Sequence, residues 1–233
     1  MDIITSRNLR DFDEKGFFIV GQKVTGEWLN KLTKECEKYN ADNPKWFQRN
    51  PHLKSGLFAE FVKQPLFVEA CKKLIGPNAD LHWNLIAHKP PFQGKEFHWH
   101  QDAQYGLTEP EHYITCWVAL DVVTIGNGCL WVIPGSHKWG RLDHVFLRET
   151  ETFYAGRFAQ DVDDKNQVPI EMYAGEIAIF HSHVLHRSGS NSSDKLRRSY
   201  ICAYHHCNLT YLTDPGMKGA EFPILRKNKV VGS

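Results

Sequence analysis

Beyond residue 80 the chain alternates between short runs of β-branched, aromatic and aliphatic residues and clusters of turn residues. The runs cover residues 81–88, 97–101, 113–123, 129–133, 177–185 and 199–206. Gly126-Asn127-Gly128 and Pro134-Gly135-Ser136 are two of the turn clusters. Many short strands separated by turns are typical of a β-sandwich or barrel. The pattern therefore predicts a mainly β protein with a jelly-roll core.

The first 80 residues carry a different pattern. Residues 17–20 predict a short strand, and Thr25 can cap a helix whose apolar residues recur at helical spacing up to Cys36. Pro65 opens a second helix over 66–74. We expect a single domain over 1–233, with helical N-terminal support over about 1–80, the jelly-roll core over about 81–207 and a C-terminal extension over 208–233.

One connection is unusually long. Residues 142–168 are rich in polar side chains and show weak periodicity. Long connections inside compact domains are usually functional, and a lid is the natural interpretation.

Composition excludes several classes of partner. The net charge is +1, and the 28 Lys and Arg residues are scattered rather than clustered, which argues against nucleic acid. The sequence shows neither a secretory h-region nor an apolar run long enough for a membrane span. Its six cysteines form no CxxC pair, which favours a reducing, cytoplasmic location. No feature indicates a protein partner.

The first chemical motif is Phe97-His98-Trp99-His100-Gln101-Asp102. On a strand, residues i and i+2 point to the same face. His100 and Asp102 would then present an imidazole and a carboxylate side by side, as two ligands of one metal require.

A second histidine-rich segment, 180–191, contains His181, His183 and His186. A third ligand from a distant strand would complete a 2-His-1-carboxylate facial triad, the arrangement of non-haem iron(II) oxygenases. His181 and His183 have the opposite strand parity from His186, and structural roles are the commoner expectation for them.

His186 and Arg197 lie symmetrically about the turn 191–194. If the chain folds back there, the two side chains face each other, either across a strand pair or across two packed sheets about 10 Å apart. A five-carbon dicarboxylate fits that gap. Arginine suits its far end because the guanidinium binds a carboxylate bidentately.

The chain resembles the phytanoyl-CoA dioxygenase family from about residue 11 to 207. Six blocks in the same order carry the resemblance: Lys89-Pro90-Pro91, Trp99-His100-Gln101-Asp102, Trp117 to Asp121, Asn127 to Leu130, Val132 to His137, and His186 to Asn191 leading to Arg197. The resemblance implies a double-stranded β-helix, the jelly roll of cupin-like barrels. It also implies iron(II) bound by His100, Asp102 and His186, and 2-oxoglutarate anchored by Arg197, with Trp117 and Ser188 lining the co-substrate pocket.

By the same resemblance, O2 is the second co-substrate, and succinate and CO2 are products of an enzyme that hydroxylates an unactivated C–H bond. Related halogenases replace the carboxylate ligand by a small residue, so Asp102 favours hydroxylation. The substrate is expected to be a small metabolite, otherwise unspecified. The alternative is a non-catalytic member that binds a 2-oxo acid or a metal.

Plainer alternatives accompany these assignments. His98 with His100 could form a cupin-type HxH pair, but no Glu follows nearby, so His98 is expected to pack beside the site. Arg198 should point away from Arg197 into an ion pair, although a one-residue slip would exchange the two. Lys89 is expected to be solvated, and Trp131 to be a core aromatic.

Overall fold

The computed structural model describes residues 2–42, 46–105, 108–212 and 222–232. Four α-helices precede most of the strands: α1 (Ser6–Lys15), α2 (Gly26–Asp42), α3 (Gly56–Phe61) and α4 (Pro65–Leu74). The predicted helices at 25–36 and 66–74 correspond to α2 and α4. Among all the described residues, no helix is both long and apolar enough to cross a bilayer.

Two antiparallel sheets form the body of the protein. The larger runs in the order β1-β11-β6-β13-β3-β15-β16, with β2 also paired to β3. Its strands are β1 (Phe17–Val20), β2 (Phe47–Arg49), β3 (Ala79–Lys89), β6 (Tyr113–Ala119), β11 (Ile177–His181), β13 (Arg197–His206), β15 (Phe222–Arg226) and β16 (Lys229–Val230).

The smaller sheet has the order β10-β7-β12-β4. Its strands are β4 (Phe97–His100), β7 (Leu130–Val132), β10 (Val168–Ile170) and β12 (His186–Ser188). Two strand pairs lie outside these sheets: β5 (Thr108–Glu109) with β14 (Thr210–Tyr211), and β8 (His144–Leu147) with β9 (Gly156–Ala159). The predicted jelly roll with supporting helices is confirmed.

The large sheet is buried on both faces, which explains its nearly continuous apolar runs. Along β6, Cys116 and Val118 pack in one core cluster with the helices, whereas Trp117 and Ala119 pack in a second cluster with the small sheet. Successive residues alternate between the two layers because side chains on a strand alternate faces.

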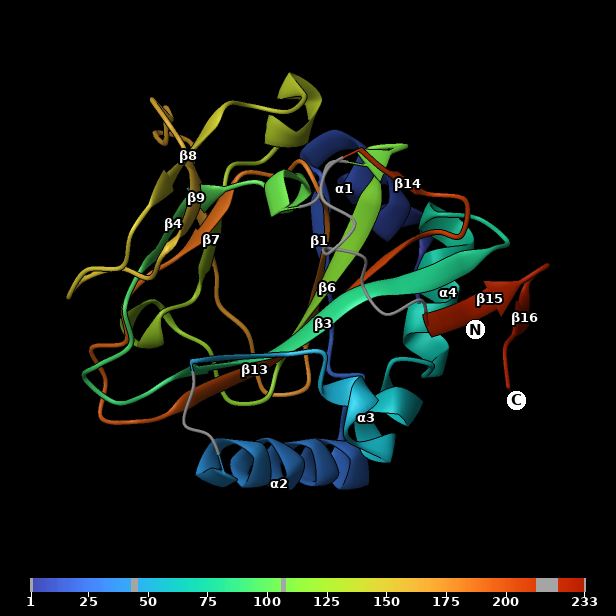
Figure 1. Cartoon of the computed structure of the whole chain (residues 1–233), viewed down its shortest axis with the longest axis horizontal. Helices are drawn as coiled ribbons and strands as arrows, with labels where there is room; N and C mark the ends of the chain where they lie inside the picture. The colour runs from blue at the N-terminus through green and yellow to red at the C-terminus, as the bar shows by residue number, and fades with distance from the viewer. Residues whose placement is uncertain (1, 43–45, 106–107, 213–221, 233) are drawn as a thin grey trace.

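The helices cover the outer face of the large sheet. Figure 1 shows α2 and α3 on one side of β3 and β13, with β4, β7, β8 and β9 on the other. Leu32 and Cys36 of α2 are fully buried in the same cluster as Tyr200 of β13. This layer leaves the space between the two sheets for a site.

Several strands come from outside the segment expected to form the core. β1 and β2 lie in the N-terminal part that was expected to be helical support, and β15 lies in the C-terminal extension. β1 pairs with β11, β2 with one edge of β3, and β15 also with β3. Both ends of the chain therefore contribute to the large sheet.

The long connection 142–168 contains the β8–β9 pair rather than irregular chain alone. Phe158 of β9 packs on Phe97, and Tyr154 packs on Phe47, with ring centroids 5.1 and 5.2 Å apart. Ala155 lines the cavity between the sheets. The segment thus forms a wall of that cavity, and its role as a lid stays a prediction.

Four histidines gather where α1, β11 and the 3-10 turn Ser136–Trp139 meet. The ring of His181 lies 4.7 Å from His112, 5.2 Å from His183 and 5.5 Å from His137. Phe12 of α1 also packs on His181, and Glu111 contacts His183 at 3.3 Å. Burial, and then repulsion by the neighbouring histidines, lowers the pKa of His181 to about 3.

We expect this cluster to make the protein acid-sensitive. An unfolded histidine takes up a proton near pH 6.5, whereas native His181 does so only near pH 3. The stability that comes from keeping it neutral is complete above pH 6.5 and decreases as the pH falls toward 3.

Thermal melting at pH 7.5, 6.0 and 5.0 measures this effect. The melting temperature should fall with pH, and it should fall less in His181→Gln, which has no titrating ring. An equally steep dependence in the variant would show that the cluster does not cause the acid sensitivity.

Candidate metal centre

The three predicted metal-binding side chains meet at the edge where β4 and β12 run side by side. His100 ends β4 and is the cross-strand partner of His186, which begins β12. Asp102 was expected on the same strand as His100, and this was wrong. β4 ends at His100, and Asp102 opens a 3-10 turn, Asp102–Tyr105, which brings the carboxylate beneath both imidazoles.

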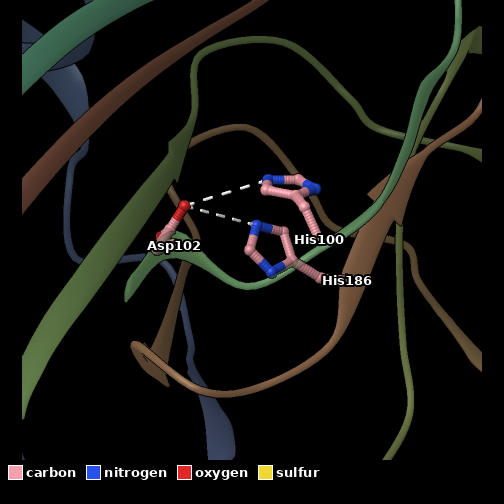
Figure 2. A group of neighbouring side chains, drawn as sticks. All are labelled: His100, Asp102 and His186. Carbon is pink, nitrogen blue, oxygen red and sulfur yellow. Dashed lines mark ion pairs between the residues drawn. The ribbon is translucent and has the colours of Figure 1, made fainter. Parts of the chain in front are cut away.

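The distances suit a single cation. Asp102 Oδ1 lies 3.8 Å from His100 Nε2 and 3.7 Å from His186 Nε2. The three potential ligand atoms lie within 4.8 Å of one another, and all three residues are buried. Figure 2 shows both rings turned toward the carboxylate. No other group of this kind occurs in the described ranges of the chain.

Backbone carbonyls fix the tautomer of both rings. His100 Nδ1 lies 2.8 Å from the His98 carbonyl oxygen, and His186 Nδ1 lies 2.9 Å from that of Val184. A carbonyl oxygen only accepts hydrogen bonds, so each Nδ1 carries the proton and donates. In the neutral form of each ring, Nε2 then has a free lone pair facing Asp102, the state that a metal ligand requires.

Thr115 orients the carboxylate. Its hydroxyl donates to Asp102 Oδ2 at 2.6 Å, which leaves Oδ1 to face the two imidazoles. Burial raises the pKa of Asp102, and burial followed by the proximity of His186 holds the pKa of His100 well below its ordinary value. Thr115 was not predicted from the sequence, although it shares a strand face with Trp117, which was expected to line the co-substrate pocket.

Gln101 holds the turn between the two ligands. This fully buried side chain donates to the carbonyls of Gly140 and His183, both at 2.8 Å, and accepts from the backbone of Leu142. The turn after β4 is thereby tied to the segments that flank β8 and β12. Gln101, the middle residue of the His-Gln-Asp motif, therefore has a structural role that was not predicted from the sequence.

Arg197 faces the metal centre from the opposite sheet. It begins β13 of the large sheet, while His186 belongs to the small one, so the turn 191–194 carries the chain across the two packed sheets. Arg197 and the three predicted metal ligands line one cavity of about 580 Å³. Of the two arrangements left open by the sequence, the inter-sheet one is present.

The guanidinium of Arg197 is buried without a carboxylate partner in the part of the chain that the structure describes. It donates to Ser199 Oγ at 2.9 Å and lies over the Trp117 ring at 5.3 Å, while its Nε has no hydrogen-bond partner. Burial lowers its pKa to about 10, so it remains cationic at neutral pH. A buried cation with an unused donor is suited to a bound anion.

Trp117 and Ser188 line the same cavity, in agreement with the positions expected for them. Their contacts with a co-substrate stay predictions.

Lys89 was expected to be solvated, and this was wrong. Its side chain is 2% exposed, lines the cavity and donates to the carbonyls of Lys95 and Gly189. It is the cross-strand partner of Arg197 at the end of β3. Burial, followed by the charge of Arg197, places the pKa of this amine well below its ordinary value. Only the strand register reveals this position.

The neighbouring alternatives are resolved by contacts. Arg198 points to the helical layer and pairs with Asp121 at 2.7 Å and with Glu37. His98 packs on Phe153, with ring centroids 4.5 Å apart, and does not line the cavity. Trp131 is partly buried against the second core cluster and stacks under Arg187, 5.0 Å away.

Fold and site together define a jelly-roll protein with a buried 2-His-1-carboxylate cluster, the class to which non-haem iron(II) oxygenases belong. A model of the family described as phytanoyl-CoA dioxygenase matches residues 12–199. The chain therefore belongs to the phytanoyl-CoA dioxygenase family.

Individual relatives agree with this membership. A zebrafish (Danio rerio) protein, phytanoyl-CoA dioxygenase domain-containing protein 1, is 33% identical over 81% of this chain and 60% of its own length. Human peroxisomal phytanoyl-CoA dioxygenase is 30% identical over 92% of this chain and 72% of its own length. The chain thus spans less than two thirds of the zebrafish relative.

A solved structure shares the fold. The epimerase SnoN, in complex with Fe3+, alpha ketoglutarate and nogalamycin RO, superposes with a TM-score of 0.76 at 19% identity, covering 97% of this chain and 95% of that one.

The contact between Thr115 and Asp102 yields a prediction about metal affinity. Thr115→Val keeps the shape of the side chain but removes the hydroxyl that orients the carboxylate, so we expect affinity for a divalent metal to fall about 10- to 100-fold. Thr115→Ser, which keeps the hydroxyl, should bind nearly as tightly as the unaltered protein. Titration of the metal-free proteins with cobalt(II), followed by visible absorption, tests this. Equal affinities in the valine and serine variants would contradict it.

Proposed function

We propose that the protein is an iron(II)- and 2-oxoglutarate-dependent dioxygenase that hydroxylates an unactivated C–H bond of a small metabolite and releases succinate and CO2. One observation carries the proposal: His100, Asp102 and His186 line the same cavity as the guanidinium of Arg197. This guanidinium is buried and has no carboxylate partner among the described residues. A binding protein for either ligand alone has no need of both groups.

The residues present fit both groups. The two Nε2 atoms and Asp102 Oδ1 form three neighbouring ligands on one side of the metal position, and a facial triad of this type leaves open positions for other ligands. The positive charge of Arg197 complements the far carboxylate of 2-oxoglutarate. Trp117 covers one face of its guanidinium, and Ser188 also lines the cavity.

When bound, iron and 2-oxoglutarate supply the activation of O2, and the protein supplies position and exclusion of water. Asp102 and the two histidines hold the metal, Thr115 and Gln101 hold Asp102 in place, and Arg197 orients the co-substrate. The presence of a carboxylate at position 102 supports oxygenation over halogenation.

The cavity volume supports a small-molecule substrate, and the cysteines support a cytoplasmic location. A cavity of about 580 Å³ is in the range typical of small-molecule sites. A cytoplasmic location is supported by the cysteines, because all six are free thiols, as is usual in a reducing compartment.

Anaerobic addition of iron(II) and 2-oxoglutarate to the metal-free protein tests the cofactor assignment. We expect the weak visible charge-transfer band of the chelate, and we expect it to vanish in Asp102→Ala and Arg197→Ala. Release of succinate in air, followed without added substrate, then separates an oxygenase from a non-catalytic binding protein. A folded protein that never shows the band would refute the proposal.

Lys89 provides an independent prediction. Its amine lies beside Arg197 at the same end of the cavity, so it adds a positively charged or hydrogen-bonding group near the proposed carboxylate position. Lys89→Met should raise the 2-oxoglutarate concentration needed for half of the band by about 10-fold, because hydrogen bonds to charged groups contribute roughly 1.5–3 kcal/mol. Affinity for the metal alone should change little. A variant with normal 2-oxoglutarate affinity would restrict Lys89 to its two carbonyl contacts.

A further inference from the structure

Besides Arg197, Lys89 and Arg187, the cavity has a further basic side chain, Arg49, far from Arg197. β2 pairs with β3 so that Phe47 is opposite Ala87 and Arg49 is opposite Leu85. Directly paired residues share a sheet face. Arg49 and Phe47 therefore project to the same side as Ala87 and Leu85, and all four line the cavity.

The strand register separates the two arginines. Arg197 is opposite Lys89, on the other side of β3 from β2. From Lys89 to Leu85 is four residues, or about 13 Å along the strand, and two strand spacings add roughly 10 Å across it. Arg49 is thus too distant to share one five-carbon dicarboxylate with Arg197 while that dicarboxylate also reaches the metal position.

Arg49 has no acidic partner among the described residues. It is exposed, at the mouth of the cavity, and no ion pair involves it in the ranges that the structure covers. Arg187, another cation of the lining, is instead held between Trp99 and Trp131 and hydrogen-bonded to Gln167.

Charge counting leaves no anion for several basic side chains of the lining. Asp102 is the only carboxylate among the described residues that line the cavity. In the proposed function, a divalent metal is balanced by Asp102 and one carboxylate of 2-oxoglutarate, and Arg197 is balanced by the other. No anion of the described residues or of the co-substrate remains for Lys89, Arg187 or Arg49. Lys89 donates to two backbone carbonyls, and Arg187 lies against two tryptophan rings and Gln167, whereas Arg49 makes no ion pair among the described residues.

Apolar side chains make up much of the lining near Arg49. Phe47 and Leu85 share its sheet face, and Trp83, Phe97 and Ile201 also line the cavity. The lining further includes the polar side chains of His82, Asn84 and Tyr105. A ligand that extends from Arg49 to the metal centre can therefore contact aromatic and aliphatic surface and meet a cation at its outer end.

We propose that the substrate is an organic anion with an apolar body, whose carboxylate or phosphate pairs with Arg49 while the body reaches the triad. This inference rests on the proposed function. The guanidinium suits both anions because its planar fork donates two parallel hydrogen bonds. The pair fixes one end of the substrate and thereby determines which carbon lies next to the metal.

Three matched pairs of probes test the inference: octanoate with octanamide, 3-phenylpropionate with its amide, and octyl phosphate with octanol. Anaerobic calorimetric titration of the protein saturated with a divalent metal and 2-oxoglutarate, so that Arg197 already has its proposed anion, measures each affinity. At least one acid should bind about 10-fold more tightly than its neutral partner, and 0.5 M NaCl should weaken that preference because the pair is exposed.

Variants assign the preference to a residue. Arg49→Gln should abolish it and Arg49→Lys should retain part of it, with circular dichroism to verify folding. Arg148→Gln is the matched control, because Arg148 is exposed, without an ion pair among the described residues, and outside the lining. It should bind all the probes as the unaltered protein does.

The inference is overturned if no acid is preferred, or if the preference persists in Arg49→Gln. These outcomes are distinct from failure of the proposed function. A protein that prefers the acids but shows no chelate band refutes only the oxygenase assignment, and one that shows the band without any preference refutes only the role of Arg49.

Discussion

The register of β13 within the large sheet is the constraint on which the site depends. This strand is buried on both faces, with Tyr200 in the helical layer and Ser199 facing the small sheet. A shift by one residue would move every side chain to the opposite layer and exchange the two arginines. Arg198 opposes that shift, because its ion pair with Asp121 fixes it on the helical side. The orientation of Arg197 toward the cavity is therefore set by packing and charge on the far face of the sheet.

The three predicted metal ligands are held in place by groups that are not ligands themselves. Backbone carbonyls hold the two imidazoles, Thr115 holds Asp102, and Gln101 ties the intervening turn to its surroundings. Such contacts place the ligands before a metal arrives, which reduces the conformational entropy lost on binding. The ligands come from the small sheet and the turn after it, and their support comes partly from the large sheet. The packing of the two sheets thus determines the geometry of the centre.

Electrostatics divides the cavity into two ends. Near the junction of β3 and β13, Arg197 and Lys89 place two basic groups without acidic partners among the described residues. At the mouth, Arg49 adds a separate cation. A site whose described residues include one carboxylate and several bases is suited to hold two anions at once. This division connects the proposed co-substrate and the inferred substrate to different strands of one sheet.

The sequence by itself determined the fold class and the identity of the triad, because strand periodicity, turn residues and motif order are local properties. β1 and α4 follow directly from such patterns. Tertiary structure alone decided what depends on contacts between distant segments. Asp102 lies outside the strand on which it was expected, because β4 ends at His100. Lys89 is buried because β13 pairs with β3 at this position. The cavity position of Arg49 likewise depends on the pairing of β2 with β3. Register and sheet packing are long-range choices that no local spacing encodes.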